Sequence, residues 1–352
     1  MRWLWSASAV LSLAALGLGA SSAPVLAPHL RVYYPNFTPK PGTLYGLQIS
    51  GENPWYSLAI APNGDVYYPD RNFGQIHFSP ATGRFDVVTS AFQPVETPLG
   101  RRAVGVLLSA IDPEGRLYTD GGPGILGGVT PTSASSVITT PNAFSDMEFA
   151  PDGRLYTADP GRDPAIAAID EAWSQEYRIV ARYVCDCDFL RIAIDARYVY
   201  AVDTMGAIYQ FTPDLVLLRT IVTGSGEGTI RSIAPDLQDG VWFADRGSGQ
   251  IGYVGPNGSV RRFTPPFSNA YEARVDMVAT ASDGTVWFVG DGDSKLVNVD
   301  RTGTMTVFPI PGAIRVEGDR GLYFKGTFGM PYSTNGDELV FQNGTLLVVT
   351  GV

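Results

Sequence analysis

Apolar and polar residues follow one another along this chain in short runs, and each run ends at a turn. In the segment 57–90, an apolar run leads into an Asn-Gly turn at 63–64, and three further runs follow it. Runs of this length and alternation predict β-strands, and four in succession predict one antiparallel four-stranded sheet. After the N-terminal region no stretch repeats its apolar residues with helical spacing and caps, so we expect almost no helix. The nearest candidate, 170–183, fits two strands equally well.

The same phrase recurs seven times: a turn, a strand with an aromatic residue, and a closing polar residue. The turn positions are 64, 115, 153, 196, 240, 284 and 321. Their spacing, 37 to 51 residues, is that of a β-propeller blade. We therefore predict an all-β propeller of four-stranded antiparallel blades in one domain. The seven repeated turns favour seven blades. A total of six blades is the alternative, because the unit around residue 115 fits the pattern least well. The segment 30–34 is predicted to pair with a blade and close the ring, since an open ring would expose sheet edges.

Six of the seven units close with an aspartate, at 70, 120, 159, 203, 245 and 291. Six equivalent acids around a ring cannot form one catalytic centre. We expect each to accept hydrogen bonds from backbone amides of its own turn. The recurring aromatic residues are predicted to pack between blades.

The first 22 residues predict a secretory signal peptide, with Arg2, a short apolar run and small residues before the cleavage point. The apolar run is shorter than the ~20 residues of a membrane span. We expect a mature chain of residues 23–352 that is secreted or periplasmic, without a membrane span, and monomeric. Its two cysteines, Cys185 and Cys187, are two positions apart, and a disulfide and two buried free thiols both stay open.

The 352 residues carry a net charge of −10, and no basic run exceeds two residues. Nucleic acid is therefore excluded as a partner, because phosphates require clustered cations. The chain has only two histidines, His29 and His77, which excludes a histidine metal pair and a serine–histidine–aspartate triad at the channel rim.

Candidate site residues come from the position seven before each turn, where the innermost strand is expected to start at the central channel. The count gives Tyr56, Leu107, Ser145, Asp188, Ser232, Asp276 and Ala313. Asp188 and Asp276 are acids in a slot that is otherwise apolar or hydroxylic. Two acids there could bind Ca²⁺ or Mg²⁺, or share a proton. The alternative, which we favour, is that both cap strand ends in solvent. Ser145, Ser232 and the nearby Arg274 are predicted to contact a ligand, the arginine either as an anion site or by neutralising an acid.

Residues 232–266 and 275–311 resemble repeats of the streptogramin lyase (virginiamycin B lyase) family, which is an NHL-type propeller. The resemblance implies seven blades and a metal-dependent elimination that opens a cyclic depsipeptide ester. The family places a catalytic histidine in the rim slot, where this chain has Ser232 or Asp276, so the lyase histidines are absent.

The motif GENPW (51–55) is similar to the start of the gluconolactonase-like (senescence marker protein, SMP-30) family of six-bladed metal hydrolases. This resemblance implies Glu52 and Asp276 as metal ligands, with Asp276 also catalytic. The family's asparagine ligand has no counterpart, since Ser145 fills the corresponding slot.

Two functions follow from these observations. We favour an exported scaffold that binds a small molecule or a protein, because the lyase histidines are missing and most acids are structural. The alternative is a divalent-metal hydrolase or lyase for a lactone or ester, with Glu52, Asp188 and Asp276 as ligands. There the metal would polarise a carbonyl or activate water.

Overall fold

The structure is a computed structural model. It describes residues 29–33, 58–70, 74–90, 93–97, 100–104, 108–120, 126–130, 133–138, 144–159, 164–172, 177–266, 274–281, 284–291, 295–309, 338–342 and 346–350.

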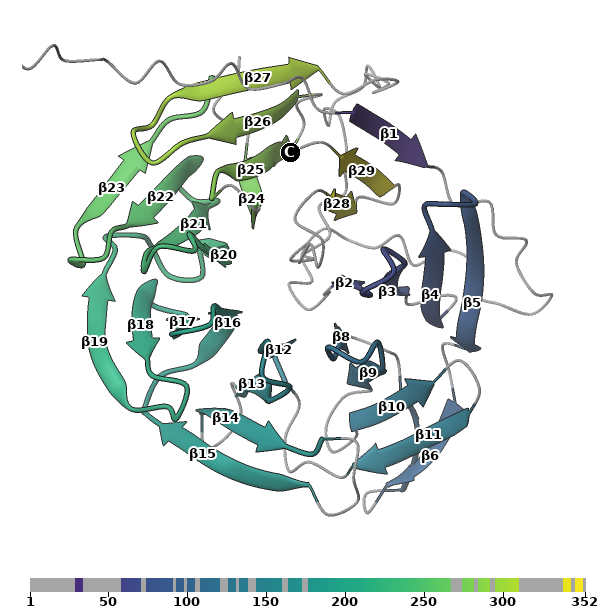
Figure 1. Cartoon of the computed structure of the whole chain (residues 1–352). Coiled ribbons are helices and arrows are strands. Elements are labelled where there is room, and N and C mark those ends of the chain that lie inside the picture. Colours follow the sequence, from purple (N-terminus) through teal and green to yellow (C-terminus); the bar gives the residue numbers. More distant parts are fainter. Residues whose placement is uncertain are drawn as a thin grey trace, which may run out of the picture.

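Six four-stranded antiparallel sheets stand around a common centre, as Figure 1 shows. The first three contain β2 (Ala59–Ile60), β3 (Val66–Asp70), β4 (Gly74–Ser79) and β5 (Arg84–Ser90); β8 (Leu108–Ile111), β9 (Leu117–Asp120), β10 (Leu126–Thr130) and β11 (Ser133–Ile138); and β12 (Asp146–Phe149), β13 (Leu155–Asp159), β14 (Ala165–Asp170) and β15 (Arg178–Val184). The next three contain β16 (Phe189–Ile194), β17 (Val199–Asp203), β18 (Ala207–Phe211) and β19 (Leu217–Val222); β20 (Ile230–Pro235), β21 (Val241–Asp245), β22 (Gln250–Val254) and β23 (Val260–Phe263); and β24 (Arg274–Thr280), β25 (Val286–Asp291), β26 (Lys295–Val299) and β27 (Met305–Pro309).

The predicted all-β propeller with four-stranded antiparallel blades is confirmed. Each sheet follows chain order, with its first strand innermost and its fourth at the rim (Figure 1). The described part of the chain contains no helix, and the 170–183 segment holds the end of β14 and most of β15. A separate hairpin, β6 (Gln93–Thr97) with β7 (Gly100–Val104), lies between the first two sheets in sequence. It accounts for the long spacing between the first two turns.

The two ends of the chain meet in one sheet. β1 (His29–Tyr33) pairs antiparallel with β29 (Leu346–Thr350), which pairs with β28 (Glu338–Gln342). The register places His29 opposite Thr350 and Tyr33 opposite Leu346. The predicted pairing of an N-terminal strand with the last sheet is therefore confirmed. This sheet shows three strands among the described residues, so the total of seven blades stays a prediction.

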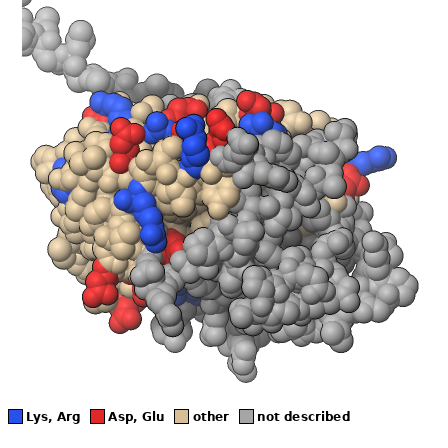
Figure 2. Space-filling model, turned by 90° about the horizontal axis from the view of Figure 1, so that it is seen from below, with Lys and Arg blue, Asp and Glu red and all other residues tan. Residues whose placement is uncertain are grey.

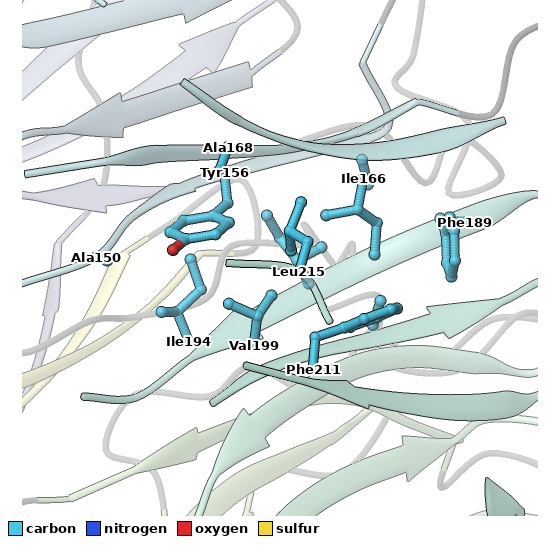
Figure 3. Packing of buried hydrophobic residues seen from close by; sticks show 12 residues of the cluster. Ala150, Tyr156, Ile166, Ala168, Phe189, Ile194, Val199, Phe211 and Leu215 are labelled. Carbon is cyan, nitrogen blue, oxygen red and sulfur yellow. The ribbon is translucent and has the colours of Figure 1, made fainter. Parts of the chain in front are cut away.

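Neighbouring blades pack face to face through the recurring aromatic residues. Figure 3 shows the layer between the third and fourth sheets, where Tyr156 packs among Ile194, Val199 and Leu215. The hydroxyl of Tyr156 crosses this interface and donates to the backbone oxygen of Pro213 at 2.7 Å. The equivalent residues Tyr118, Tyr200, Trp242 and Trp287 are also almost fully buried, which confirms their predicted role in packing.

Two of the closing aspartates, Asp203 and Asp245, accept hydrogen bonds from backbone amides of their own turns, as predicted. Asp203 accepts a hydrogen bond from the Ala207 amide at 2.8 Å and one from the Tyr209 hydroxyl at 3.0 Å. Asp245 accepts from the amides of Gly247 and Ser248. The side chains of Asp70, Asp120 and Asp291 lie outside the described residues.

The cysteines form a disulfide. Cys185 and Cys187 are joined in the loop between β15 and β16, with their Cα atoms 5.2 Å apart. On the face drawn in Figure 2, blue basic side chains stand beside red acidic ones and do not gather into a patch. Among the described segments, no helix has the length and apolar character needed to cross a bilayer.

Candidate functional site

The inner strands carry a shared irregularity that shifts the predicted rim slot. One residue bulges out of the ladder in each of β16, β20 and β24, namely Leu190, Arg231 and Asp276. In the third blade Ser145 takes this place. It directly precedes Asp146, which pairs with Ala158, and its amide donates to the Ala158 backbone oxygen. Relative to the bulge, the slot counted from sequence selects equivalent positions at Ser145 and Asp276. It is two residues early at Asp188 and one late at Ser232, because the turns before Tyr198 and Gly240 differ in length.

Ser145 and Ser232 are both buried and both join adjacent blades. Ser145 Oγ donates to the backbone oxygen of Phe189 at 2.8 Å, and Ser232 Oγ accepts from the amide of Val278 at 3.3 Å. Their described hydrogen bonds are thus structural, and no ligand is needed to explain them.

Two of the acids predicted as metal ligands, Asp188 and Asp276, come from the fourth and sixth four-stranded sheets. Asp188 is exposed and directly precedes β16, whereas Asp276 and Arg274 belong to β24. β20 lies between these two strands, in contact with both. The side chains of Asp276 and Arg274 and all of Glu52 lie outside the described residues. In the part of the chain with described side chains, no three histidine, cysteine or acidic residues come close enough to hold a metal. The Glu52, Asp188 and Asp276 metal site stays a prediction.

A cavity of about 360 Å³ is lined by the innermost strands β2, β8 and β12 and the turns that follow them. These three strands stand side by side near the centre of Figure 1. Its walls are largely apolar. They include Leu58, Ile60, Met147, Phe149 and prolines 62, 113 and 151. Four polar residues also line it: Ser109, Asp112, Asp146 and Glu148. A mainly apolar pocket with a few polar groups is the usual form of a small-molecule site.

Three of the four polar residues are already engaged. Ser109 donates to Gln75 Oε1 at 3.1 Å. Asp112 Oδ1 accepts from two turn amides, and its Oδ2 pairs with the Arg116 guanidinium. Asp146 accepts from its neighbouring Met147 amide and, through Oδ2, from the Ile192 amide of β16, each at 3.0 Å. These contacts tie strand edges and turns together.

Burial and charge act in opposite directions on Asp146. Burial raises the pKa of its carboxyl, while the positive charge of Arg191 and the two backbone hydrogen bonds lower it. Arg191 is itself buried and donates to the backbone oxygens of Ser145 at 2.8 Å and of Arg231 at 3.0 Å. The Asp146 carboxylate therefore has both hydrogen bonds and a nearby compensating charge.

Glu148 differs from these residues. It lies two positions beyond Asp146 on β12, so both side chains point to the same face of the strand. Burial raises the pKa of Glu148 well above its ordinary value, the charge of Asp146 adds to this, and a hydrogen bond from the Ile194 backbone opposes it. Its Oε2 atom is buried and has no hydrogen-bond partner among the described residues. Glu148 is thus a cavity-lining residue with unused hydrogen-bonding capacity at an atom that is itself buried.

The repeat shows that a glutamate is not required by the fold at this position. Glu148 faces Tyr156 across the β12–β13 ladder. In the other five four-stranded sheets the residue facing the repeated aromatic is always alanine: Ala59, Ala110, Ala193, Ala234 and Ala279. Counting seven residues before the turn missed this departure. Counting from the aromatic, which is fixed in the ladder, would have found it in the sequence.

Replacing Glu148 by alanine, the residue of the other blades, is expected to stabilise the protein. The native state holds the Glu148 proton more tightly than the unfolded chain does. The free energy of unfolding of the wild-type protein therefore falls as the pH rises from the ordinary glutamate pKa of 4.5 through the raised native pKa. Above that range we expect Glu148→Ala to gain about 1 to 2 kcal/mol in free energy of unfolding, net of the lost Ile194 bond. Near pH 4.5 the gain should vanish. Urea unfolding of both proteins across pH measures this, and a pH-independent difference would contradict it.

No protein-family model matches the chain, and no curated protein matches it. Solved structures do match. Virginiamycin B lyase from Staphylococcus aureus superposes with a TM-score of 0.65 at 15% identity, covering 93% of this chain and all of that one. A catalytically inactive variant of that lyase with quinupristin gives a TM-score of 0.66 at 14% identity, again over 93% of this chain and 100% of that one.

The fold is shared more widely. The WD40 propeller domain of Doa1 matches with a TM-score of 0.59 at 13% identity, over 84% of this chain and 92% of that one. At these identities the likeness shows a common fold. The resemblance to streptogramin lyase propellers expected from the repeats is thus confirmed for the fold.

Proposed function

We propose that this protein is a binding scaffold that holds a small molecule in the cavity lined by β2, β8 and β12. The observation that carries the proposal is the cavity itself, apolar over most of its wall and lined by four polar residues, Ser109, Asp112, Asp146 and Glu148. Alanine at the same repeat position in the first two sheets leaves room where the third sheet has a long side chain. A rigid ring of sheets gives such a pocket a fixed shape.

Binding is favoured over lyase catalysis by the placement of the histidines. Of the two in the chain, His77 lies on β4, where its Nε2 is 3.1 Å from Asp65 Oδ2 and its ring packs against that of Tyr67 in a tilted arrangement. His29 lies on β1. Neither belongs to the cavity wall. The alternative, a divalent-metal hydrolase or lyase using Glu52, Asp188 and Asp276, rests on sequence alone.

We also infer that the protein is exported and has seven blades. Export is supported by the N-terminal signal pattern and by the Cys185–Cys187 disulfide, because disulfides persist in oxidising compartments. The sheet of β1, β28 and β29 would be the seventh blade, since it joins both ends of the chain beside the six complete ones.

The neutral dye N-phenyl-1-naphthylamine tests the proposed function, since its fluorescence rises in apolar surroundings. We expect saturable binding to the wild-type protein. Ala110→Leu places a larger side chain in the cavity wall and should weaken the affinity at least tenfold. Ala167→Leu makes the same change on β14, away from the cavity, and should leave the affinity unchanged. Absence of saturable binding to the wild type would contradict the proposal, as would equal effects of the two substitutions in proteins that remain folded.

A further inference from the structure

The two most exposed large apolar side chains among the described residues lie at the same end of the fourth sheet. Val222, the last residue of β19, is 82% exposed, and Met205, in the turn between β17 and β18, is 65% exposed. Val222 faces Ala207 across the β18–β19 ladder, and Thr223 Oγ1 donates to the Gly206 backbone oxygen at 2.6 Å. These contacts hold the end of β19 against the turn that carries Met205.

A half-buried surface of aromatic rings and sulfur continues from there towards the third sheet. Tyr209 lies two residues after Ala207 on β18, so its side chain is on the same face of the fourth sheet as Val222. The ring of Tyr183, on β15, has its centroid 6.5 Å from that of Tyr209. The Cys185–Cys187 disulfide packs against the same cluster. We define the outer patch as Tyr183, Cys185, Cys187, Met205, Tyr209 and Val222.

Three exposed acidic residues adjoin the outer patch. Asp186 lies between the two cysteines, and Asp188 directly follows the second one. The backbone oxygen of Asp188 accepts from the Thr204 amide at 2.8 Å, and the Thr204 oxygen accepts from the Gly228 amide at 2.6 Å. The second bond brings Glu227, the third exposed acid, to the same end of the sheet. A partner whose charge complements this surface is therefore positive.

Two basic side chains of the neighbouring strands are directed elsewhere. Arg182 precedes Tyr183 on β15 and so points to the opposite face of the third sheet. Arg262, in the fifth sheet, donates to Asp245 at 2.7 Å. A second copy of this chain is a poor occupant as well. A two-fold contact would place the acids of one copy against those of the other, in a chain that already carries a net charge of −10.

The chemistry of the outer patch selects arginine as the positive group. A guanidinium stacks on aromatic faces and forms paired hydrogen bonds with carboxylates, and this surface offers both. Exposed apolar side chains such as Val222 and Met205 favour apolar residues beside that arginine. We propose that the outer patch binds a segment of a partner protein that carries arginine beside apolar residues. None of the six residues lines the cavity of β2, β8 and β12, so this site is independent of the proposed function.

Three fluorescein-labelled peptides of equal length test the inference by fluorescence anisotropy. The first alternates arginine with leucine, the second glutamate with leucine, and the third arginine with serine. We expect the wild-type protein to bind the first with a dissociation constant at least tenfold lower than either of the others. Added salt should weaken its binding, because the exposed carboxylates contribute to it.

Two double variants separate the charged contribution from the apolar one. Asp186→Asn with Asp188→Asn should reduce the preference for arginine over glutamate. Met205→Ser with Val222→Thr should bring the preference for leucine over serine to within twofold of one. All four side chains are exposed, so both variants should melt at the wild-type temperature.

The matched controls make the same kinds of change away from the outer patch. Glu114→Gln, in the turn after β8, and Val307→Thr, on β27 and 38% exposed, should keep both wild-type ratios. Equal affinities of the three peptides for the wild type would overturn the inference, and so would unchanged ratios in the two double variants. It would also be overturned if sedimentation showed a wild-type dimer that Met205→Ser with Val222→Thr converts to a monomer, because a second copy would then occupy the patch.

Discussion

Replacing Asp236 by asparagine is expected to lower the free energy of unfolding by about 2 to 4 kcal/mol. Breaking a buried ion pair by removing one partner typically costs about 3 to 5 kcal/mol, and the partly exposed Arg301 reduces that here. The Asp236 side chain is fully buried after β20. It accepts from the amides of Gln238 and Gly240, each at 2.7 Å, and from the Tyr253 hydroxyl at 2.6 Å. It also accepts from Arg301 Nε at 3.0 Å, and Arg301 belongs to the next sheet.

An asparagine cannot replace all of these contacts. Its amide nitrogen would face the Arg301 guanidinium or the turn amides, donor against donor. Burial, and then the hydrogen bond to Asp236, raise the pKa of Tyr253 to about 12, so its hydroxyl remains a donor at neutral pH. The turn is also tightly packed: a Cβ on Gly240 would lie 2.7 Å from Asp236 Oδ2. The site therefore has little room to relax.

Asp300→Asn is the matched control for this substitution. Asp300 also accepts hydrogen bonds from amides of its own turn, those of Thr302 and Thr304, but it is only partly buried. We expect it to cost about 1 kcal/mol or less, since it joins no second blade through an arginine. Urea unfolding of both variants at pH 7 makes the comparison. Equal losses would show that the link to Arg301 contributes nothing to stability.

The repeated turns explain why the fold could be predicted from the sequence. Each blade repeats its aromatic residue, such as Tyr156 or Trp242, at the same place in the second strand, and the ladder fixes its cross-strand partner. The apolar–polar alternation then sets the face that each strand buries. Because the pattern occurs seven times, an error in one unit does not change the predicted architecture. The pairing of an N-terminal strand with the last sheet was also predicted, and the structure describes it for residues 29–33.

The candidate site could be predicted from the sequence only in part, because it depends on features that the repeats do not have in common. The bulges at Leu190 and Arg231 and the unequal turns before Tyr198 and Gly240 shift the register of the inner strands, so a fixed count selected Asp188 in place of the equivalent residue Leu190. Bulges redirect side chains without a sequence signature of their own. Glu148 did have a signature, as the one acid where other blades have alanine.

Removal of β1 is expected to have the largest effect on the fold. A chain that starts at Tyr34 lacks the strand that pairs with β29 from His29 to Tyr33. Five residue pairs are lost at once, each contributing about 0.2 to 1 kcal/mol. The open edge of β29 also becomes available to other chains, which promotes aggregation. Domains are stable by only about 5 to 15 kcal/mol, so this loss is a large share of the total.

The matched control is a chain that starts at Ala23, which keeps β1 and lacks only the predicted signal peptide. We expect this protein to melt cooperatively by circular dichroism. The shorter chain should melt at a temperature at least 10 °C lower or aggregate on purification.

A synthetic peptide of residues 23–35 added to the shorter chain should raise its melting temperature, because the vacant edge of β29 can accept the strand from a second molecule. Equal melting temperatures for the two chains would mean that the pairing of β1 with β29 does not hold the ring closed. A peptide with the same composition in scrambled order separates specific strand addition from non-specific binding. Rescue by the native order alone would assign the stability of the ring to the register in which His29 faces Thr350.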